Sequence, residues 1–196
     1  MGARDRMALL IKSGKSFSEI GLYTGVHTAA ATISMGKTLA VCALYLPPGI
    51  TISKHSLAEF FEQLPKLFLV LGDLNVHFPA WGDSRRDGRG TMLKEFMAEN
   101  DRIALNSGEQ IFVHSAYHST STIDLAVTSP SIVIECFWAA HSDLYRSNHF
   151  LIILTFKFYL NGYIHIPSFN FCKADWNRFG ELCRLSLDDC VVHTLS

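Results

Sequence analysis

The apolar run at residues 67–71 (LFLVL) constrains the fold of this chain more than any other segment, because it stops abruptly at the polar sequence GDLN, residues 72–75. A short continuous apolar run bounded by turn residues is typical of a buried strand. Asp73 and Asn75 therefore lie where a buried strand ends, and that is where open α/β sheets carry their chemistry. The run predicts an α/β fold with a polar site at this edge.

Strand and helix patterns alternate along the rest of the chain and predict a layered α/β sandwich. Apolar residues at helical spacing predict helices over residues 53–64, which Pro65 ends, and 92–99. Extended apolar segments predict strands at residues 7–11, 29–34, 39–46, 103–105, 111–113, 122–128, 134–138 and 150–156, the second and third forming a hairpin. We predict one domain over residues 1–157 and a tail over residues 158–196, in which Asp175 caps a short helix.

The composition excludes several classes of protein. Of the 196 residues, 48% are hydrophobic and 18% are charged, which favours a dense folded core over disorder. The longest apolar run, residues 150–156, is far shorter than the roughly 20 residues that span a bilayer, so we expect no membrane partner. The five cysteines are odd in number and irregularly spaced, which predicts a reduced, intracellular protein. Cys183, Cys190 and His193 fit no zinc module.

The charge balance gives no global attraction to nucleic acid. The net charge is −1, so any nucleic acid must be held locally. Arg85, Arg86 and Arg89 form the tight basic cluster of the chain, but Asp83 and Asp87 dilute it. We therefore interpret this segment as a solvated loop rather than a binding patch.

Polar residues at three strand ends predict phosphodiester hydrolysis, which needs an aligned water, a base, and groups that hold charge on the phosphorus oxygens. Asp73 is the candidate base, and Asn75 orients the water or a phosphate oxygen, although the same sequence is also ordinary turn chemistry. Asp124 lies in an apolar strand and requires a partner if it is buried. His149 is the natural partner, because a carboxylate fixes the imidazole tautomer and leaves its other nitrogen for a phosphate.

Two aromatic residues near these strand ends are further candidates. Tyr45 ends a predicted strand just before Pro47, and its phenol is either a donor to the same phosphate or a packing group. Trp81 follows Asn75 and is either a stacking platform for the substrate or an anchor of the loop. We favour the anchor.

Several segments match one known pattern in order: residues 41–48 (VCALYLPP), 72–75 (GDLN), 79–82 (PAWG), 105–109 (LNSGE), 121–125 (STIDL), 129–131 (SPS) and 147–150 (SNHF). Through them the chain resembles the endonuclease/exonuclease/phosphatase family, and within it the endonuclease domain of jockey-like non-LTR retrotransposons. The resemblance spans most of residues 2–157. In the tail, residues 169–176 (FNFCKADW) resemble the linker that such elements place before their reverse transcriptase.

The resemblance implies a four-layer α/β sandwich of the deoxyribonuclease I type, and an endonuclease that uses Mg²⁺ or Mn²⁺ to nick double-stranded DNA in the nucleus. The implied catalytic residues are Asp73 as the base, Asn75 as the group that orients the water, Asp124 and His149 as a phosphate-binding pair, and Tyr45 as a further phosphate contact. Trp81 and Ser147 are the implied substrate-binding residues. The parent element also carries a reverse transcriptase, which we do not expect in this chain.

Two departures from the family pattern predict an impaired enzyme. The family's metal-binding glutamate lies upstream of the segment that resembles residues 7–12, so we expect this chain to lack that ligand and the first strands. Asn148 stands where the family has aspartate, which makes it a weak metal ligand. The alternative is an inactive remnant with at most weak DNA binding, whereas a small-molecule phosphatase lacks support. An uncovered sheet edge also predicts self-association.

Overall fold

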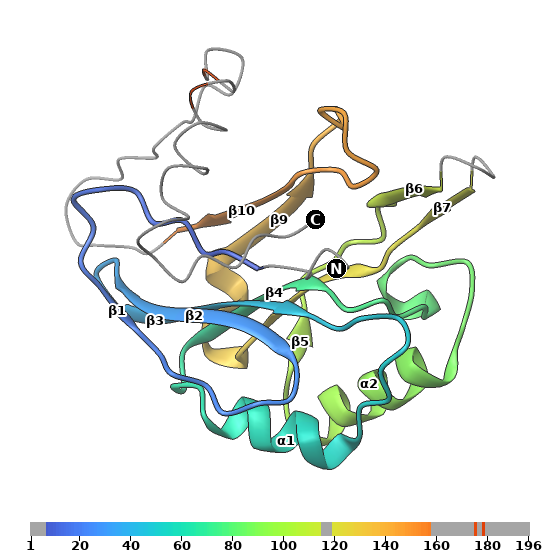
Figure 1. Ribbon diagram of the computed structural model, residues 1–196, viewed down its shortest axis with the longest axis horizontal. Helices are drawn as coiled ribbons and strands as arrows, with labels where there is room; N and C mark the ends of the chain where they lie inside the picture. The colour runs from blue at the N-terminus through green and yellow to red at the C-terminus, as the bar shows by residue number, and fades with distance from the viewer. Residues whose placement is uncertain (1–6, 115–118, 158–174, 176–177, 179–196) are drawn as a thin grey trace, which may run out of the picture.

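The computed structural model describes residues 7–114 and 119–157, together with Asp175 and Arg178. Its centre is a mixed sheet of six strands in the order β1-β2-β3-β4-β8-β5. Helices α1 and α2 lie on one side of this sheet, and the pair formed by β9 and β10 lies on the other (Figure 1). No helix in these described ranges is long and apolar enough to cross a bilayer. The layered α/β architecture is therefore confirmed.

The first half of the large sheet is the expected hairpin. β2 (His27–Ser34) pairs antiparallel with β3 (Thr38–Tyr45), and the short strand β1 (Phe17–Glu19) adds to the outer edge of β2. The hairpin turns at Gly36, whose φ of 80° is a left-handed conformation that glycine adopts without a steric cost.

The second half of the sheet brings the site into position. β4 (Phe68–Asp73) pairs in parallel with β3, and helix α1 (Lys54–Glu62) makes the crossover between them. The Ser53 side chain caps α1 by accepting a hydrogen bond from the backbone N–H of Ser56 at 3.0 Å, and the helix ends before Pro65, as predicted. β8 (Asp124–Thr128) lies antiparallel between β4 and β5 (Ile103–Ala104), so every residue of β8 is buried.

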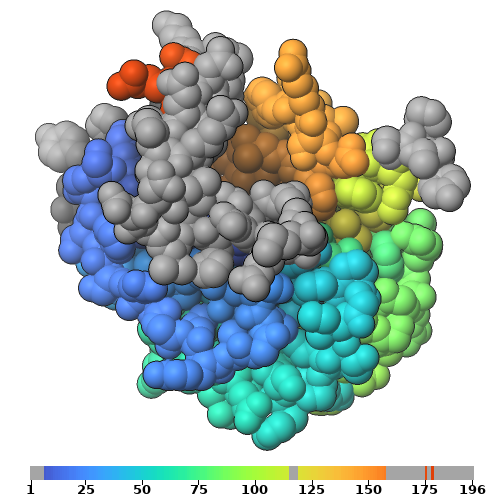
Figure 2. All heavy atoms as spheres, viewed as in Figure 1, coloured from blue at the N-terminus to red at the C-terminus, as the bar shows by residue number. Residues whose placement is uncertain are grey.

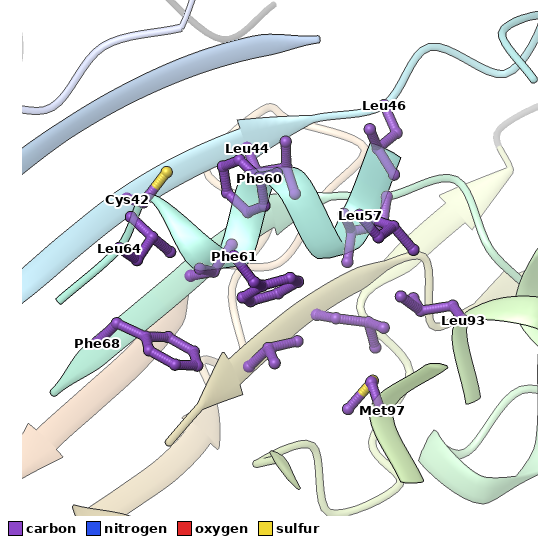
Figure 3. Close-up of a cluster of buried hydrophobic side chains, with 14 of the residues drawn as sticks. Cys42, Leu44, Leu46, Leu57, Phe60, Phe61, Leu64, Phe68, Leu93 and Met97 are labelled. Carbon is purple, nitrogen blue, oxygen red and sulfur yellow. The ribbon is translucent and has the colours of Figure 1, made fainter. Parts of the chain in front are cut away.

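The core fills the space between the sheet and its two helices (Figure 3). Helix α2 (Gly88–Glu99) starts at Asp87, whose carboxylate accepts a hydrogen bond from the backbone N–H of Gly90 at 2.6 Å. Phe61 of α1 lies at the centre of an aromatic group, with ring centroids 5.4 Å from Phe68 of β4 and 5.6 Å from Phe96 of α2. Burying each such ring contributes roughly 2 kcal/mol, so helices and sheet stabilise one another.

Two further strand pairs flank the large sheet. β6 (Phe112–His114) pairs with β7 (Ser119–Ser121), and β9 (Cys136–Ala140) pairs with β10 (Ile152–Phe156). Two short 3₁₀ helices, η1 (Pro79–Trp81) and η2 (Pro130–Glu135), complete the described elements. The segment that joins β9 to β10 stands out from the surface beside the β6–β7 pair (Figure 2).

Two sequence predictions need correction. Residues 7–11 form no strand: Met7 is buried at 1% exposure, but the segment joins no hydrogen-bonded ladder. Residues 134–138 are only partly extended, because η2 continues to Glu135 before β9 begins; Pro130 favours that helical turn by fixing its own φ.

Candidate active site

The register of β4 against β8 brings two carboxylates to one edge of the large sheet. Asp73 is the last residue of β4 and stands opposite Asp124, the first residue of β8. The end of β3 reaches the same place, because the backbone N–H of Leu46 donates a hydrogen bond of 2.9 Å to the carbonyl of Asp73. The predicted strand-end site therefore has Asp73 and Asp124 as neighbours.

His149 completes a hydrogen-bonded pair with Asp124. The distance from His149 Nδ1 to Asp124 Oδ2 is 2.7 Å, and the Asp124 side chain is 11% exposed while that of His149 is 33% exposed. Burial opposes protonation of the imidazole, but the hydrogen bond to Asp124 and the charges of Asp124 and Asp73 outweigh it and raise the pKa of His149. The predicted pairing of the two side chains is thus present in the structure.

The β6–β7 pair holds the backbone of His149 in place. His149 forms a β-bridge with Phe112, and the two rings meet edge to face with centroids 4.6 Å apart. On either side of it, the N–H of Val113 donates to the carbonyl of Asn148 at 2.8 Å and the N–H of Phe150 donates to the carbonyl of Ile111 at 2.7 Å. The loop that carries His149 is therefore a paired strand at this point.

Asp73 is held in a turn with Asn75. The backbone N–H of Asn75 donates to Asp73 Oδ1 at 2.9 Å, and the Asn75 amide donates from Nδ2 to the carbonyl of Leu46 at 3.1 Å. Asn75 adopts a φ of 47°, a left-handed conformation that asparagine tolerates better than most residues. Burial and then the charge of Asp124 raise the pKa of Asp73 to about 6, against the opposing effect of the Asn75 hydrogen bond.

Gly72 makes the close approach of β3 and β4 feasible at this edge. A Cβ atom added to Gly72 would lie 1.8 Å from the carbonyl oxygen of Leu44, and its φ of 155° also disfavours other residues. The glycine that precedes the candidate base is therefore required by the backbone and does not itself supply chemistry.

A cleft of about 510 Å³ opens beside these groups. Its polar lining includes Tyr45, Asp73, Asp124, Ser147 and His149. Apolar residues of the N-terminal segment and of β10 form much of the remaining wall. Five predicted site residues, from four separate segments of the chain, thus share one cleft.

Asn75, Trp81 and Asn148 do not line the cleft. Trp81 is 2% exposed and packs in the core against Phe78, with ring centroids 5.3 Å apart, so it offers no free face for stacking on a base. This burial fits the loop-anchor interpretation that the sequence favoured, and a role in substrate binding stays a prediction. The Asn148 residue is exposed and does not line the cleft. Its backbone carbonyl, described above, pairs with β6.

The described side chains do not form a complete site for a hard divalent cation. Within residues 7–114 and 119–157, no group of three or more His, Cys, Asp or Glu side chains is arranged to hold a metal ion. Asp73 and Asp124 are both available at the cleft, but one oxygen of Asp124 is bound to His149. Mg²⁺ prefers an octahedral shell of oxygens, and these donors supply only part of one.

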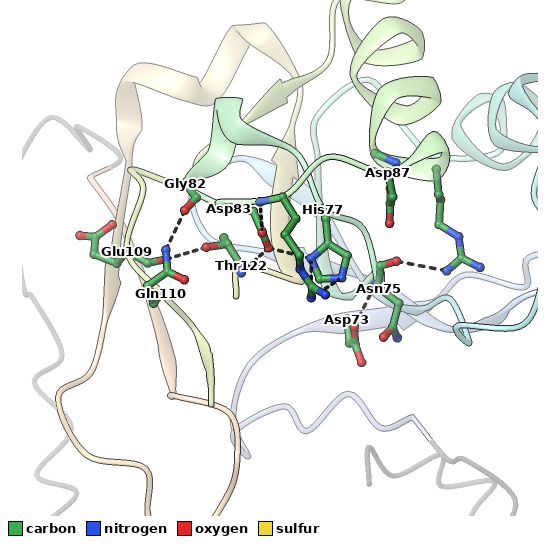
Figure 4. A network of polar contacts seen from close by, with 12 residues as sticks. Asp73, Asn75, His77, Gly82, Asp83, Asp87, Glu109, Gln110 and Thr122 are labelled. Carbon is green, nitrogen blue, oxygen red and sulfur yellow. Dashed lines mark hydrogen bonds and ion pairs between the residues drawn. The ribbon is translucent and has the colours of Figure 1, made fainter. Parts of the chain in front are cut away.

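Sequence reasoning missed a second polar network beside the site (Figure 4). Asp83 is buried at 4% exposure, and its carboxylate lies 2.8 Å from Nδ1 of His77. The predicted solvated loop is correct for Arg85 and Arg86, which are exposed, but not for the buried Asp83. It is also wrong for Arg89, which lies in α2 and donates to backbone carbonyls. The signal available was the short spacing of His77 and Asp83 after the GDLN segment.

Solved structures identify the class of fold. The endonuclease domain of TRAS1, a telomere-specific non-LTR retrotransposon, matches with a TM-score of 0.66 and 18% identity over 77% of this chain and 73% of that one. An AP endonuclease from Archaeoglobus fulgidus matches with a TM-score of 0.55 and 14% identity over 74% of this chain and 80% of that one. The sheet, the cleft and these similarities define a deoxyribonuclease I-like fold of the endonuclease/exonuclease/phosphatase type.

Sequence comparison then gives the particular family. The family model described as endonuclease-reverse transcriptase matches residues 39–153, and the chain belongs to that family. The RNA-directed DNA polymerase from mobile element jockey of Drosophila melanogaster is 32% identical over 92 residues, which is 46% of this chain and 10% of the relative. Its counterpart from Drosophila funebris is 30% identical over the same length. The chain spans about a tenth of the length of these curated relatives.

Proposed function

We propose that this chain is the endonuclease domain of a non-LTR retrotransposon, of the kind that nicks double-stranded DNA by hydrolysing one phosphodiester. The observation that carries the proposal is the meeting of Asp73 with the Asp124–His149 pair in the wall of one cleft. Membership of the endonuclease-reverse transcriptase family and the jockey relatives support the same assignment.

Each polar residue of the cleft has a role in this reaction. Asp73 takes a proton from the attacking water; a pKa of about 6 leaves it ionised and still basic near neutral pH. Asn75 fixes the orientation of Asp73 through its backbone N–H. The carboxylate of Asp124 accepts the Nδ1 proton of His149, which leaves Nε2 of the ring to face the phosphate.

The remaining residues act on the phosphate oxygens. The raised pKa of His149 favours its cationic form, which stabilises the negative charge that develops on the phosphorus oxygens. Tyr45 and Ser147 line the same cleft and present hydroxyl groups to the phosphate and its neighbours.

Mg²⁺ or Mn²⁺ is the cofactor that the family implies, and its chemistry would be neutralisation of phosphate charge. The described donors do not complete a shell for it, and the neutral Asn148 lies outside the cleft. We therefore propose that the metal binds weakly and that turnover is impaired in this chain. The second candidate, favoured by the same incomplete donor set, is an inactive remnant that retains at most weak DNA binding.

The parent element is part of the proposal. The jockey relatives are RNA-directed DNA polymerases, so a reverse transcriptase is the partner domain that we propose, with the nucleus as the place of action. The family match ends at residue 153, close to the predicted domain boundary at residue 157, but the division at that residue stays a prediction.

Nicking of supercoiled plasmid tests the function directly. We expect slow nicking by the wild-type chain with Mg²⁺ and none with EDTA, and we expect Asp73→Asn and His149→Ala each to reduce the rate by at least about 10²-fold. Glu59→Gln on α1 is the matched control, because the Glu59 side chain is 61% exposed on the helix layer. Folded wild-type protein that never nicks supports the remnant, and nicking that survives Asp73→Asn refutes the assigned roles.

A further inference from the structure

A second Asp–His pair lies next to the proposed catalytic pair. The Asp83 side chain is fully buried, at 0% exposure, and its Oδ2 lies 2.8 Å from His77 Nδ1. The same oxygen accepts the backbone N–H of Thr122 at 3.0 Å, and Oδ1 accepts the backbone N–H of Arg85 at 2.8 Å. Burial opposes the charge on Asp83, but these hydrogen bonds outweigh it and hold the pKa of the carboxyl below its ordinary value. A buried, ionised carboxylate therefore fixes the His77 ring.

The His77 ring in turn contacts the Arg85 guanidinium. Arg85 Nη2 lies 3.1 Å from His77 Nε2 and 3.4 Å from His77 Nδ1, so the guanidinium lies against the imidazole ring rather than in line with one nitrogen. Within the described ranges, no carboxylate lies at ion-pair distance from Arg85. The guanidinium is thus placed against the His77 ring without a carboxylate partner, and most of its donors are left for an anion outside the protein.

This network is attached to the catalytic segments at both ends. His77 follows Asn75 by two residues, and Thr122 precedes Asp124 by two residues. His77, Asp83 and Thr122 lie close to Asp73 and Asn75 in the same view (Figure 4), and the hydrogen bonds above confirm that the two chain segments meet there. Arg85 therefore contacts a network whose members His77 and Thr122 are each two residues from a proposed catalytic residue.

Its two neighbours in the arginine cluster are occupied differently. Arg86 donates from Nε to Thr91 Oγ1 at 3.0 Å and lies over the Phe78 ring at 5.2 Å. Arg89 donates to a set of backbone carbonyls around residues 46–50 and 74–75, including that of Pro47 at 2.9 Å. Of the three arginines, Arg85 is the one that a buried acid–imidazole pair orients.

We propose that Arg85, oriented by His77 and Asp83, binds a backbone phosphate of the DNA strand next to the phosphate that is cut. Arginine suits this role because its planar fork can bind two phosphate oxygens at once. The inference rests on the proposed DNA-cleaving function and adds a substrate-anchoring residue to it. Asp83 and His77 are positioning residues in this scheme, since neither touches the substrate.

Binding of a duplex oligonucleotide in EDTA, followed by fluorescence anisotropy, tests the proposal without requiring turnover. We expect Arg85→Gln to weaken binding about tenfold and to make the dependence of log K on log salt shallower by about 0.9, the loss of one phosphate contact. Arg85→Lys retains the charge and should recover only part of the affinity. The matched control Arg86→Gln, which changes an equally exposed neighbour, should stay within about twofold of wild type.

Neutral methylphosphonates at single positions of each strand locate the contact. We expect a methylphosphonate at one position next to the cut site to weaken binding by the wild-type protein. The same methylphosphonate should leave the binding of Arg85→Gln unchanged. A His77→Phe background tests the positioning role, because Arg85→Gln should weaken duplex binding no further there. If His77→Phe does not fold, the methylphosphonate comparison still tests the phosphate contact of Arg85.

The outcomes of these experiments distinguish a failure of this inference from a failure of the proposed DNA-cleaving function. If wild-type protein binds no duplex, the proposed function falls and this inference falls with it. If wild type binds but Arg85→Gln binds equally well, or if every methylphosphonate position acts equally on both proteins, only the inference is overturned. The inference is supported if Arg85→Gln, but not Arg86→Gln, weakens duplex binding about tenfold and if that loss is coupled to one phosphate position.

Discussion

Replacing Asp73 by asparagine should abolish catalysis and yet make the fold more stable at alkaline pH. The substitution preserves the size of the side chain and an oxygen that can accept the Asn75 N–H, but it removes a negative charge from a partly buried position beside Asp124. A residue that serves a reaction at the expense of folding is expected to behave in this way.

The magnitude follows from the pKa of Asp73. Its shift from 3.8 to about 6 is roughly two pKa units, and each unit is worth 1.36 kcal/mol, so ionised Asp73 costs the folded state about 3 kcal/mol. Because the pKa is raised on folding, the stabilising contribution is complete below pH 3.8 and is lost as the pH rises through about 6. At pH 8 the wild-type chain bears the whole cost, and Asp73→Asn bears none.

Urea unfolding in EDTA measures the difference. We expect Asp73→Asn to exceed wild type in free energy of unfolding by about 3 kcal/mol at pH 8, and the gap to shrink toward zero near pH 4. Asp101→Asn, at an exposed site, is the matched control and should show no such trend. A gap that is absent at pH 8, or that is the same at both pH values, would refute the link between burial of Asp73 and its pKa.

Three further substitutions test the site and its support. Asp124→Asn should lower the pKa of His149, because it removes the charge that favours the imidazolium; an NMR pH titration of the His149 ring measures this, and an unchanged pKa contradicts the pairing. Gly72→Ala should lower the free energy of unfolding by roughly 2–4 kcal/mol, because the added Cβ would lie 1.8 Å from a carbonyl oxygen of β3. Gly88→Ala is the control: it has open space around it and should not destabilise the fold in the same urea titration. Arg89→Met should cost about 3 kcal/mol by leaving buried carbonyls without a donor, and a loss below 1 kcal/mol in that assay would show that water replaces the guanidinium.

The elements that sequence reasoning predicted well are those whose causes are local. The hairpin at Gly36, the Ser53 cap and the strand before Asp73 each follow from residues within a few positions of one another. The pairing of Asp124 with His149 is an exception, spanning 25 residues, and it was accessible because an acid inside an apolar strand requires a partner.

The errors arise where contacts between residues far apart in the sequence determine the local structure. Residues 7–11 are as apolar as a strand, but a strand also needs a paired neighbour, and sequence does not supply one. Asp83 reads as a solvated residue among arginines, and its burial depends on the backbone N–H of Thr122, which lies 39 residues away.

The β-bridge between Phe112 and His149 makes the β6–β7 hairpin and the His149 loop one cooperative unit for local opening. The amide protons of Val113 and Phe150 are both donated across this junction, so in native-state hydrogen exchange they should share one protection factor and one dependence on denaturant. An exchange of this hairpin between related domains should keep the backbone register of residues 111–113 unchanged.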